Sequence, residues 1–290
     1  NILAKRNASI PKYTGLIDLP NENIGRVQNQ GLEIQLSHFN KIGEVNFRAS
    51  GNFMFARNKV LFMDETPWGE GHEYMNETGG PMGAGLQYRA IGIFRDQAAL
   101  DAYPHLDAAR PGDLIFEDVD GDGKITSLDR VRQNLSGFPE IIFGLNLSAD
   151  WKNFDISVLF QGQARAVKDV ISRMDATSNF YKWRAEDRWT EDNIDGTMPR
   201  AGGSINYGVE NPCSFWTQNA SFVRLKNLEV GYTLPNLWFN KLRISNCRVY
   251  LSGQNLFTLD HIKYVDPEGS GEGSYYPQMR IFNIGCNLTF

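Results

Sequence analysis

Residues 141–161 constrain the fold more than any other part of this 290-residue sequence. Apolar and polar residues alternate over 141–151, pause at 152–153, and alternate again over 154–161. Because successive side chains of a strand point to opposite faces, this pattern predicts a β-hairpin with one apolar and one polar face. Each arm has about the length that a tilted strand needs to cross a bilayer. A soluble sheet shows the same alternation, so the hairpin alone does not decide the solvent.

The same alternation predicts strands elsewhere in the chain, which makes the predicted fold class all-β. These further strands lie at 24–39, 44–57, 222–234, 242–257 and 280–290. Residues 1–23 are polar and rich in turn-forming residues, and they are predicted to form a loop. A short strand at 87–94 and a helical turn at 97–103 are expected within a long connection.

The connections between the predicted strands sort by length. Those at 40–43, 152–153 and 235–241 are short, whereas those at 58–139, 164–220 and 258–279 are long. The two kinds alternate strictly, so all short turns lie at one end of the sheet and all long loops at the other. This arrangement is typical of outer-membrane barrels, which have short periplasmic turns and long extracellular loops. A soluble β-sandwich with its function at one end is the alternative.

Composition excludes several other classes of protein. Apolar residues make up 41% and charged residues 22%, as in soluble proteins and in barrels with a polar lumen. The sequence has no run of 18 apolar residues that would predict a transmembrane helix. A net charge of −5 disfavours a nucleic-acid partner. Three widely spaced cysteines predict neither a disulfide framework nor a metal cluster, and the first residues do not resemble a signal peptide.

The number of predicted strands leads to a further expectation. About seven crossings are predicted, whereas bacterial single-chain barrels have even strand numbers. Seven strands would leave two open edges in lipid, where unpaired backbone groups are costly. Residues 1–290 are therefore expected to be the C-terminal part of a larger antiparallel transmembrane barrel, in which 58–139, 164–220 and 258–279 are extracellular loops.

Residues 118–129 follow the spacing of a calcium-binding EF-hand loop, with Gly123 at the position of the sharp turn. The predicted ligands are Asp118, Asp120, Asp122, the Lys124 carbonyl, Thr126 and Asp129. Hard oxygen donors at this spacing predict a bound Ca²⁺. Pro and Gly flank the loop where EF-hand helices would lie, so the ion is expected to order a long loop rather than to act as a sensor. An Asp/Gly-rich surface turn without metal is the alternative.

The sequence contains no nucleophile elbow, phosphate-binding loop or dinucleotide fingerprint, so the chain is not expected to be an enzyme. Aromatic residues reach 12%, and many lie in the long connections. Their rings can stack on sugar rings or pack the loops themselves. The predicted ligand-binding aromatics are Trp183, Trp189, Trp216, Tyr275 and Tyr276.

Motifs along the whole chain resemble the SusC/RagA family of TonB-linked outer-membrane proteins. They are AIGIF at 90–94, PGDLIFEDVDGDGKI at 111–125 with DR at 129–130, FGLN at 143–146, FDISVLFQG at 154–162, SFVRLKNL at 221–228, GYTLP at 231–235, SGQNLF at 252–257 and the segment 276–290. The resemblance implies a large β-barrel transporter in the outer membrane of a Bacteroidetes-type bacterium. The terminal Phe290 resembles the family's barrel-assembly signal.

The resemblance also implies partners and cargo. A SusD-like lipoprotein would cap the barrel outside, and TonB would open it through an N-terminal plug domain, which this sequence does not include. The implied substrates are oligosaccharides, with peptides as the alternative in RagA-like members. Two rivals remain. One is a soluble Ca²⁺-dependent carbohydrate-binding β-sandwich, in which the apolar strand faces pack against each other; the other is a passive porin.

Overall fold

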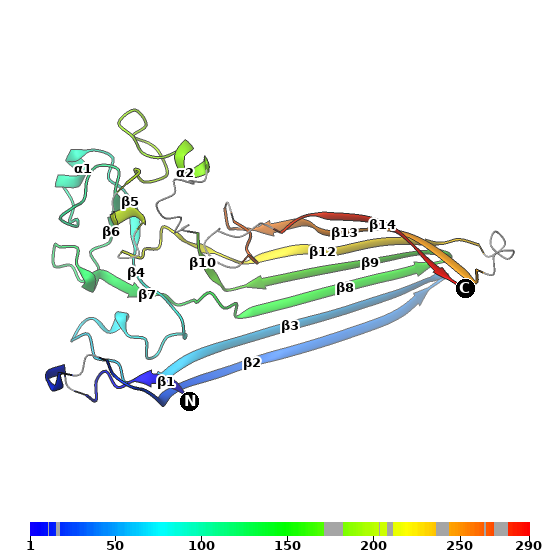
Figure 1. The fold of residues 1–290 in the computed structure, drawn as a ribbon, viewed down its shortest axis with the longest axis horizontal. Helices are drawn as coiled ribbons and strands as arrows, with labels where there is room; N and C mark the ends of the chain where they lie inside the picture. Colours follow the sequence, from blue (N-terminus) through cyan, green and yellow to red (C-terminus); the bar gives the residue numbers. More distant parts are fainter. Residues whose placement is uncertain are drawn as a thin grey trace.

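The computed structural model describes residues 1–10, 12–15, 18–170, 182–202, 204–207, 211–235, 244–263, 265–269 and 278–290. One antiparallel sheet of eight strands forms the body of the molecule, and a lobe of short elements lies at one end of it (Figure 1). The strand order is β1-β2-β3-β8-β9-β12-β13-β14, so strands that are neighbours in the sheet also follow one another along the chain.

The long strands of the sheet lie where the alternation predicts them. The strands are β1 (Ile2–Lys5), β2 (Asn21–Ile42), β3 (Val45–Phe62), β8 (Ile141–Trp151), β9 (Phe154–Ala164), β12 (Phe222–Thr233), β13 (Asn246–Asp260) and β14 (Ile281–Thr289). Cross-strand pairing is continuous from β2 to β14, with a bulge in β12 between Leu225 and Asn227.

Several strand ends differ from the prediction. β1 pairs with the start of β2, which itself begins at Asn21, so the prediction of a loop over residues 1–23 is wrong at both of its ends. β3 continues to Phe62 and β13 to Asp260, beyond the predicted ends at 57 and 257. Ladder hydrogen bonds join backbone groups whatever the side chains are, so pairing continues past the residues whose side chains alternate.

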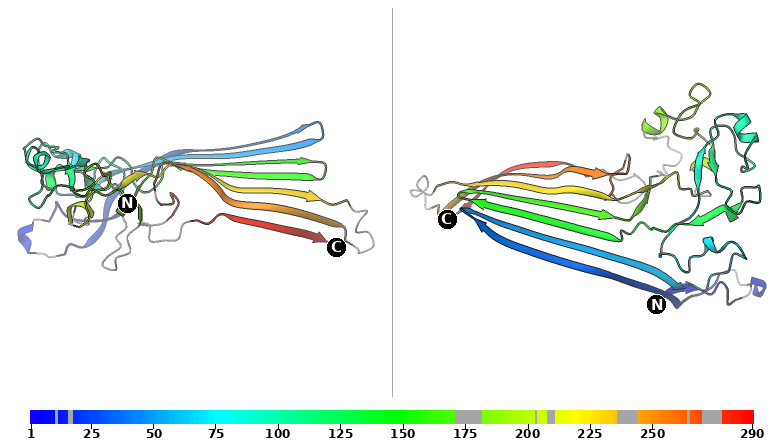
Figure 2. Two further views of the ribbon diagram at one scale, coloured as in Figure 1. Left: turned by 90° about the horizontal axis from the view of Figure 1, so that it is seen from above. Right: turned by 180° about the vertical axis from the view of Figure 1, so that it is seen from behind.

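The sheet is a single curved layer (Figure 2), and its two faces carry different kinds of side chain. Apolar side chains of one face are exposed, among them Leu36, Leu251 and Ile284, which are 72%, 58% and 87% accessible. The other face carries charged side chains such as Asp155 and Arg248, which form an ion pair. Within the described residues no second sheet covers the apolar face, so the inward packing that a β-sandwich requires is not found there.

The connections lie as their lengths predict. Lys152 and Asn153 separate β8 from β9, and Gly43 and Glu44 separate β2 from β3, at the end opposite the lobe (Figure 1). Gly43 has a φ of +62°, the left-handed conformation that glycine adopts without steric cost. Most of the predicted turn at 235–241 and part of the connection at 258–279 lie outside the described residues.

The lobe contains most of the buried apolar core. Its elements include β4 (Leu86–Tyr88), β5 (Ala90–Ile93), α1 (Gln97–Asp101), β6 (Leu114–Phe116), β7 (Arg130–Arg132), β10 (Val167–Asp169), α2 (Lys182–Glu186), α3 (Ser204–Tyr207) and β11 (Thr217–Asn219). The helical turn expected at 97–103 is thus present, whereas the single short strand expected at 87–94 is divided into β4 and β5, which belong to different sheets. Buried residues from all three long connections form one cluster, in which the rings of Tyr88 and Phe116 stack at 4.6 Å. Among the described helices, none combines the length and the apolar character needed to cross a membrane.

Candidate functional site

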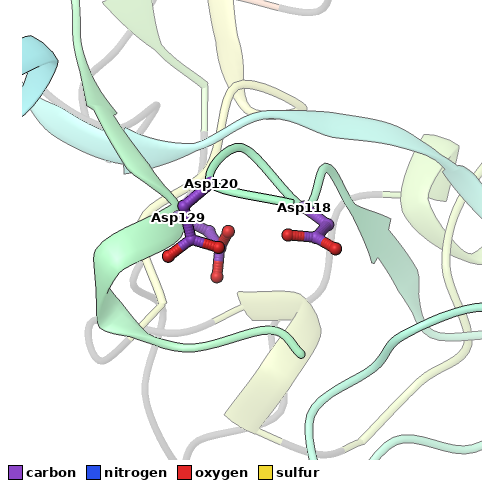
Figure 3. A group of neighbouring side chains, drawn as sticks. All are labelled: Asp118, Asp120 and Asp129. Carbon is purple, nitrogen blue, oxygen red and sulfur yellow. The ribbon is translucent and has the colours of Figure 1, made fainter. Parts of the chain in front are cut away.

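Three of the predicted metal ligands come together in the lobe. Asp118 follows β6, Asp129 ends the short 3-10 helix Ser127–Asp129, and Asp120 lies on the loop between them. One carboxylate oxygen of each residue lies within 4.8 Å of the others (Figure 3). The spacing in the sequence therefore places these three carboxylates around one point in space.

Backbone N–H groups shape the loop around these carboxylates. Asp118 accepts hydrogen bonds from the N–H groups of Gly121 and Gly123, at 2.8 and 3.0 Å. Asp129 is fully buried and accepts two further backbone N–H bonds, at 2.8 and 2.7 Å. Gly121 and Gly123 have φ values of +74° and +80°, a left-handed conformation that glycine adopts without steric cost.

The electrostatics of this cluster favour a cation. Two like unit charges about 4–5 Å apart repel by about 1 kcal/mol in water and by several times more near a protein surface. The pKa of the neighbouring Tyr74 hydroxyl is raised by burial and by the negative charges of Asp120 and Asp129. A divalent cation would remove this repulsion, and carboxylate oxygens are the donors that hard divalent cations prefer. The three residues can therefore hold a metal ion.

The remaining predicted ligands are Asp122, Lys124 and Thr126, and the Asp122 carboxylate is not grouped with the other three. The Asp122 carboxylate accepts a hydrogen bond from the Lys124 N–H at 2.8 Å. The Thr126 hydroxyl accepts one from the Leu128 N–H at 3.1 Å and so caps the 3-10 helix. The roles of Asp122, Lys124 and Thr126 as ligands remain predictions.

Two residues beside the cluster were not predicted. His72 Nε2 lies 3.4 Å from an Asp120 carboxylate oxygen, and the Tyr74 hydroxyl donates to the Leu128 carbonyl at 2.8 Å. They are 48 and 54 positions from these partners. No local spacing in the sequence could indicate such contacts.

Of the predicted ligand-binding aromatics, the structure describes the side chains of Trp189 and Trp216, and both belong to the apolar cluster of the lobe. Trp216 is buried in the lobe core, where its indole N–H donates to the Asn206 carbonyl at 2.6 Å. Trp189 donates to the Arg95 carbonyl at 3.1 Å and covers Gly112, where a Cβ would lie 2.3 Å from its ring. Both rings therefore pack the lobe. The Trp183 side chain and residues 275 and 276 lie outside the described part of the structure.

A second cluster joins the sheet to the third long connection. Arg224 of β12 is only 1% exposed. Its guanidinium donates to Asp266 at 2.7 Å, to Glu268 at 2.6 Å and to the Gln278 side chain at 2.6 Å. Lys226, at the β12 bulge, adds a bond to Glu268 at 2.9 Å. These contacts hold residues 265–269 against the polar face of the sheet.

Comparisons with known proteins extend over nearly the whole chain. No family model matches it. TonB-dependent receptor P26 of Formosa agariphila is 29% identical over an alignment 318 residues long. The alignment covers 98% of this chain and 31% of the receptor. TonB-dependent receptor SusC of Bacteroides thetaiotaomicron is 24% identical over 297 residues, covering 98% of this chain and 28% of that protein. The chain thus spans about a third of the length of these curated relatives.

Solved structures share the fold. The structure of the RagAB peptide transporter matches 97% of this chain with a TM-score of 0.69 and 24% sequence identity, over 31% of the matched chain. The RagAB peptide importer in its open-open state gives a TM-score of 0.70, again at 24% identity and covering 97% of this chain and 30% of that one.

The matched proteins are receptors and transporters. The family implied by the sequence motifs and the family of the curated relatives are the same, so the predicted resemblance is confirmed. The prediction that the chain is not an enzyme is confirmed with it, because this family is non-enzymatic. The chain is thus similar in sequence to TonB-dependent receptors of the SusC/RagA family.

Proposed function

We propose that this chain is the C-terminal part of a TonB-dependent importer and that its long strands form part of the wall of a closed outer-membrane barrel. The observation that carries the proposal is the single-layered sheet with an exposed apolar face and a polar opposite face. Strands β8 and β9 have 11 residues each, about the length that a tilted strand needs to cross a bilayer. An apolar face of this size is stable when lipid covers it.

The edges of the sheet support a larger barrel. β14 is hydrogen-bonded to β13 on one side, and among the described strands no other pairs with it. A strand edge in lipid leaves backbone N–H and C=O groups unpaired, at a cost of several kcal/mol for each group. In the proposed barrel, further strands of the receptor pair with β14 at one edge of the sheet and with the opposite edge, where β1 and β2 lie. The short turns then face the periplasm, and the lobe lies outside the cell.

The proposed cargo is an oligosaccharide or a peptide, transferred from a SusD-like surface lipoprotein and imported with energy from TonB. One support is sequence similarity to the TonB-dependent receptor SusC. The other is the fold, which matches a chain of the RagAB peptide transporter. We propose that TonB would act through a plug domain in the part of such receptors that this chain does not match.

We further propose that Asp118, Asp120 and Asp129 bind a metal ion and that this ion is Ca²⁺. Three carboxylates on an EF-hand-like loop supply the hard oxygen donors and the negative charge that Ca²⁺ sites use. Asp129 anchors the loop inside the lobe, and Ile125 inserts into the lobe core at 6% exposure. The ion would therefore stabilise the fold of the lobe rather than take part in chemistry.

Fractionation of the native bacterium tests the import function. We expect the polypeptide in the outer-membrane fraction, within a longer chain and together with a surface lipoprotein, when mild-detergent extracts are identified by mass spectrometry. Deletion of its gene, and separately of the TonB gene, should abolish uptake of the labelled cargo. Recovery of the chain as a free soluble protein would contradict the proposal.

Calcium binding is tested by replacing Asp120 with asparagine in the full-length receptor. Asparagine keeps the acceptor for the Asp122 N–H, which lies 3.1 Å away, but removes one negative charge from the cluster. We expect Ca²⁺ affinity, measured by calorimetry, to fall about tenfold or more. Asp101→Asn is the matched control, because Asp101 lies on α1, is not one of the three grouped carboxylates and should leave affinity unchanged when replaced. Equal affinity in both variants would refute the site.

A further inference from the structure

A pocket of about 240 Å³ lies at the lobe end of the hairpin formed by β2 and β3 (Figure 1). Both strands line it, together with residues 79–81 of the first long connection. Val60 of β3 holds this third segment, because its backbone N–H donates to the Gly80 carbonyl at 2.9 Å and its carbonyl accepts from the Gly79 N–H at 2.8 Å. The pocket is therefore a fixed part of the fold, bounded by three pieces of chain.

The two basic residues of this pocket, Arg57 and Lys59, lie on the same face of the sheet as the exposed apolar side chains. Residues directly opposite each other in a ladder share a face, and the same face returns every second residue. The successive pairs along this ladder are Gln28–Lys59, Gln30–Arg57 and Leu32–Phe55. Leu32 belongs to the exposed apolar face, so Arg57 and Lys59 continue that face beyond its last apolar pair.

The height of the apolar band places these two residues relative to a membrane. On β8, which pairs with β3, the band runs from Ile141, opposite Phe55, to Trp151. A strand rises about 3.3 Å per residue, so this stretch measures about 33 Å along the strand and about 25 Å across a bilayer at the usual tilt. That is about the height of the lipid-facing band of outer-membrane barrels. In the proposed barrel, Arg57 and Lys59 therefore lie just beyond the hydrocarbon, at the headgroups of the outer leaflet.

The positive charge at this level is only partly compensated. The Arg57 guanidinium lies 3.3 Å from a Glu140 carboxylate oxygen, but the same carboxylate also pairs with Arg165 at 2.6 Å. One negative charge thus faces two positive charges. The Lys59 ammonium is exposed and has no ion pair or hydrogen bond with any residue that the structure describes. Because no acidic residue is among the described residues that line the pocket, the pocket is net positive.

We propose that this pocket binds a phosphate group of a phosphorylated glycolipid in the outer leaflet, with Lys59 as the main contact and Arg57 as the second. Ammonium and guanidinium groups form charge-assisted hydrogen bonds with phosphate oxygens. The side-chain amides of Gln28 and Gln30, which bond to each other at 3.3 Å, lie opposite these cations and supply donors and acceptors for sugar hydroxyls. The pocket is smaller than most small-molecule sites, so it suits one headgroup phosphate rather than a cargo molecule.

The apolar face completes the match with a lipid. Acyl chains that descend from a headgroup in the pocket would lie along Leu32 and Phe55, the pair directly next to the basic residues. A free phosphate ion would use the pocket but not this face. The inference rests on the proposed barrel for the position of the lipid, whereas the binding itself needs neither TonB nor cargo.

The test uses the full-length receptor, purified in detergent at low salt and washed free of native lipid. The two probes are diphosphoryl lipid A and the same lipid A with both phosphates removed, and bound lipid is counted by mass spectrometry after gel filtration. Lys59→Gln removes the exposed charge, and a double variant adds Arg57→Gln. Lys41→Gln is the matched control, because Lys41 is an exposed lysine at the opposite end of β2.

The wild type and Lys41→Gln should retain equal amounts of diphosphoryl lipid A. Lys59→Gln should retain about fivefold less and the double variant about tenfold less or lower, because each cation beside an anionic lipid surface contributes about this much. Removing the phosphates should lower retention by the wild type and leave that of the double variant unchanged. If the double variant does not fold, Lys59→Gln decides, since this side chain has no described partner to lose. Equal retention of the two lipids by the wild type, or wild-type retention by Lys59→Gln, would overturn the proposal.

The lipid site and the import function fail separately in these experiments. TonB-dependent uptake by intact cells, combined with lipid retention that ignores the phosphates, would remove the lipid site and leave the import function intact. Recovery of the chain as a free soluble protein that still retains diphosphoryl lipid A through Lys59 would overturn the import function and leave the phosphate site.

Discussion

Replacing Arg224 by methionine in the full-length receptor is expected to release residues 265–269 from the sheet and to lower the free energy of unfolding by about 3–5 kcal/mol. Arg224 is 1% exposed and forms ion pairs with Asp266 and Glu268. The side chains of these two acidic partners are only 15% and 17% exposed. Methionine keeps the length and most of the apolar contacts. The two carboxylates then lose the guanidinium that compensates them in a poorly solvated place, and removing one member of such a set is costly.

Two measurements check this result. Hydrogen exchange should rise in 265–269 and at the outer end of β12. The temperature at which the protein unfolds, measured by electrophoresis of samples heated to increasing temperatures, should fall. The control is Arg89→Met, which breaks an exposed pair with Glu117 at 3.2 Å, where the side chains are 54% and 38% exposed. That variant should lose less than about 1 kcal/mol, since solvent screens exposed pairs. Equal losses in the two variants would show that the Arg224 cluster does not hold the segment.

The sequence predicts the long strands because one physical rule covers them all. A strand with one face in lipid or core and the other in water must alternate, and the alternation over 141–151 and 154–161 recovers β8 and most of β9. The outer parts of β2 and β3 do not follow this rule. There Arg26 pairs with Phe62 and Gln30 with Arg57, so backbone bonds extend the hairpin where side chains give no periodic signal. β1 has four residues, too few for a period to be recognised.

The sequence predicts contacts of the candidate sites only between residues that lie close together in the chain. The spacing of Asp118, Asp120 and Asp129 identifies three carboxylates that come together, because a loop of this length with glycines at 121 and 123 folds back on itself. Contacts between connections carry no such signal. The Arg224 cluster joins residues 42 to 54 positions apart, and the pocket beside Lys59 depends on how residues 79–81 fold against the sheet.

Replacing Gly31 by alanine should disrupt the hairpin of β2 and β3, at a cost of about 3 kcal/mol or more. A Cβ at Gly31 would lie 2.1 Å from the Phe55 carbonyl oxygen and 2.8 Å from the Ala56 Cα, both of which are backbone atoms of the paired strand. No rotamer change relieves such a contact, so the two strands must move apart and their ladder bonds around Gly31 must lengthen. Glycine within a strand marks this kind of close backbone approach.

Gly51→Ala is the matched control for this prediction. Gly51 lies on β3, which pairs with β2, the strand that contains Gly31. A Cβ there meets its nearest neighbours, the Gly144 carbonyl and a Leu145 methyl, at 3.8 Å, an ordinary contact. We expect Gly51→Ala to insert into the outer membrane and to resist denaturation as the wild type does. Gly31→Ala should insert poorly, and what does insert should exchange amide hydrogens faster at 29–33 and 54–58. If Gly31→Ala behaves like Gly51→Ala, the strands do not approach as closely as the structure shows, and the pairing of β2 with β3 must shift locally to admit a side chain.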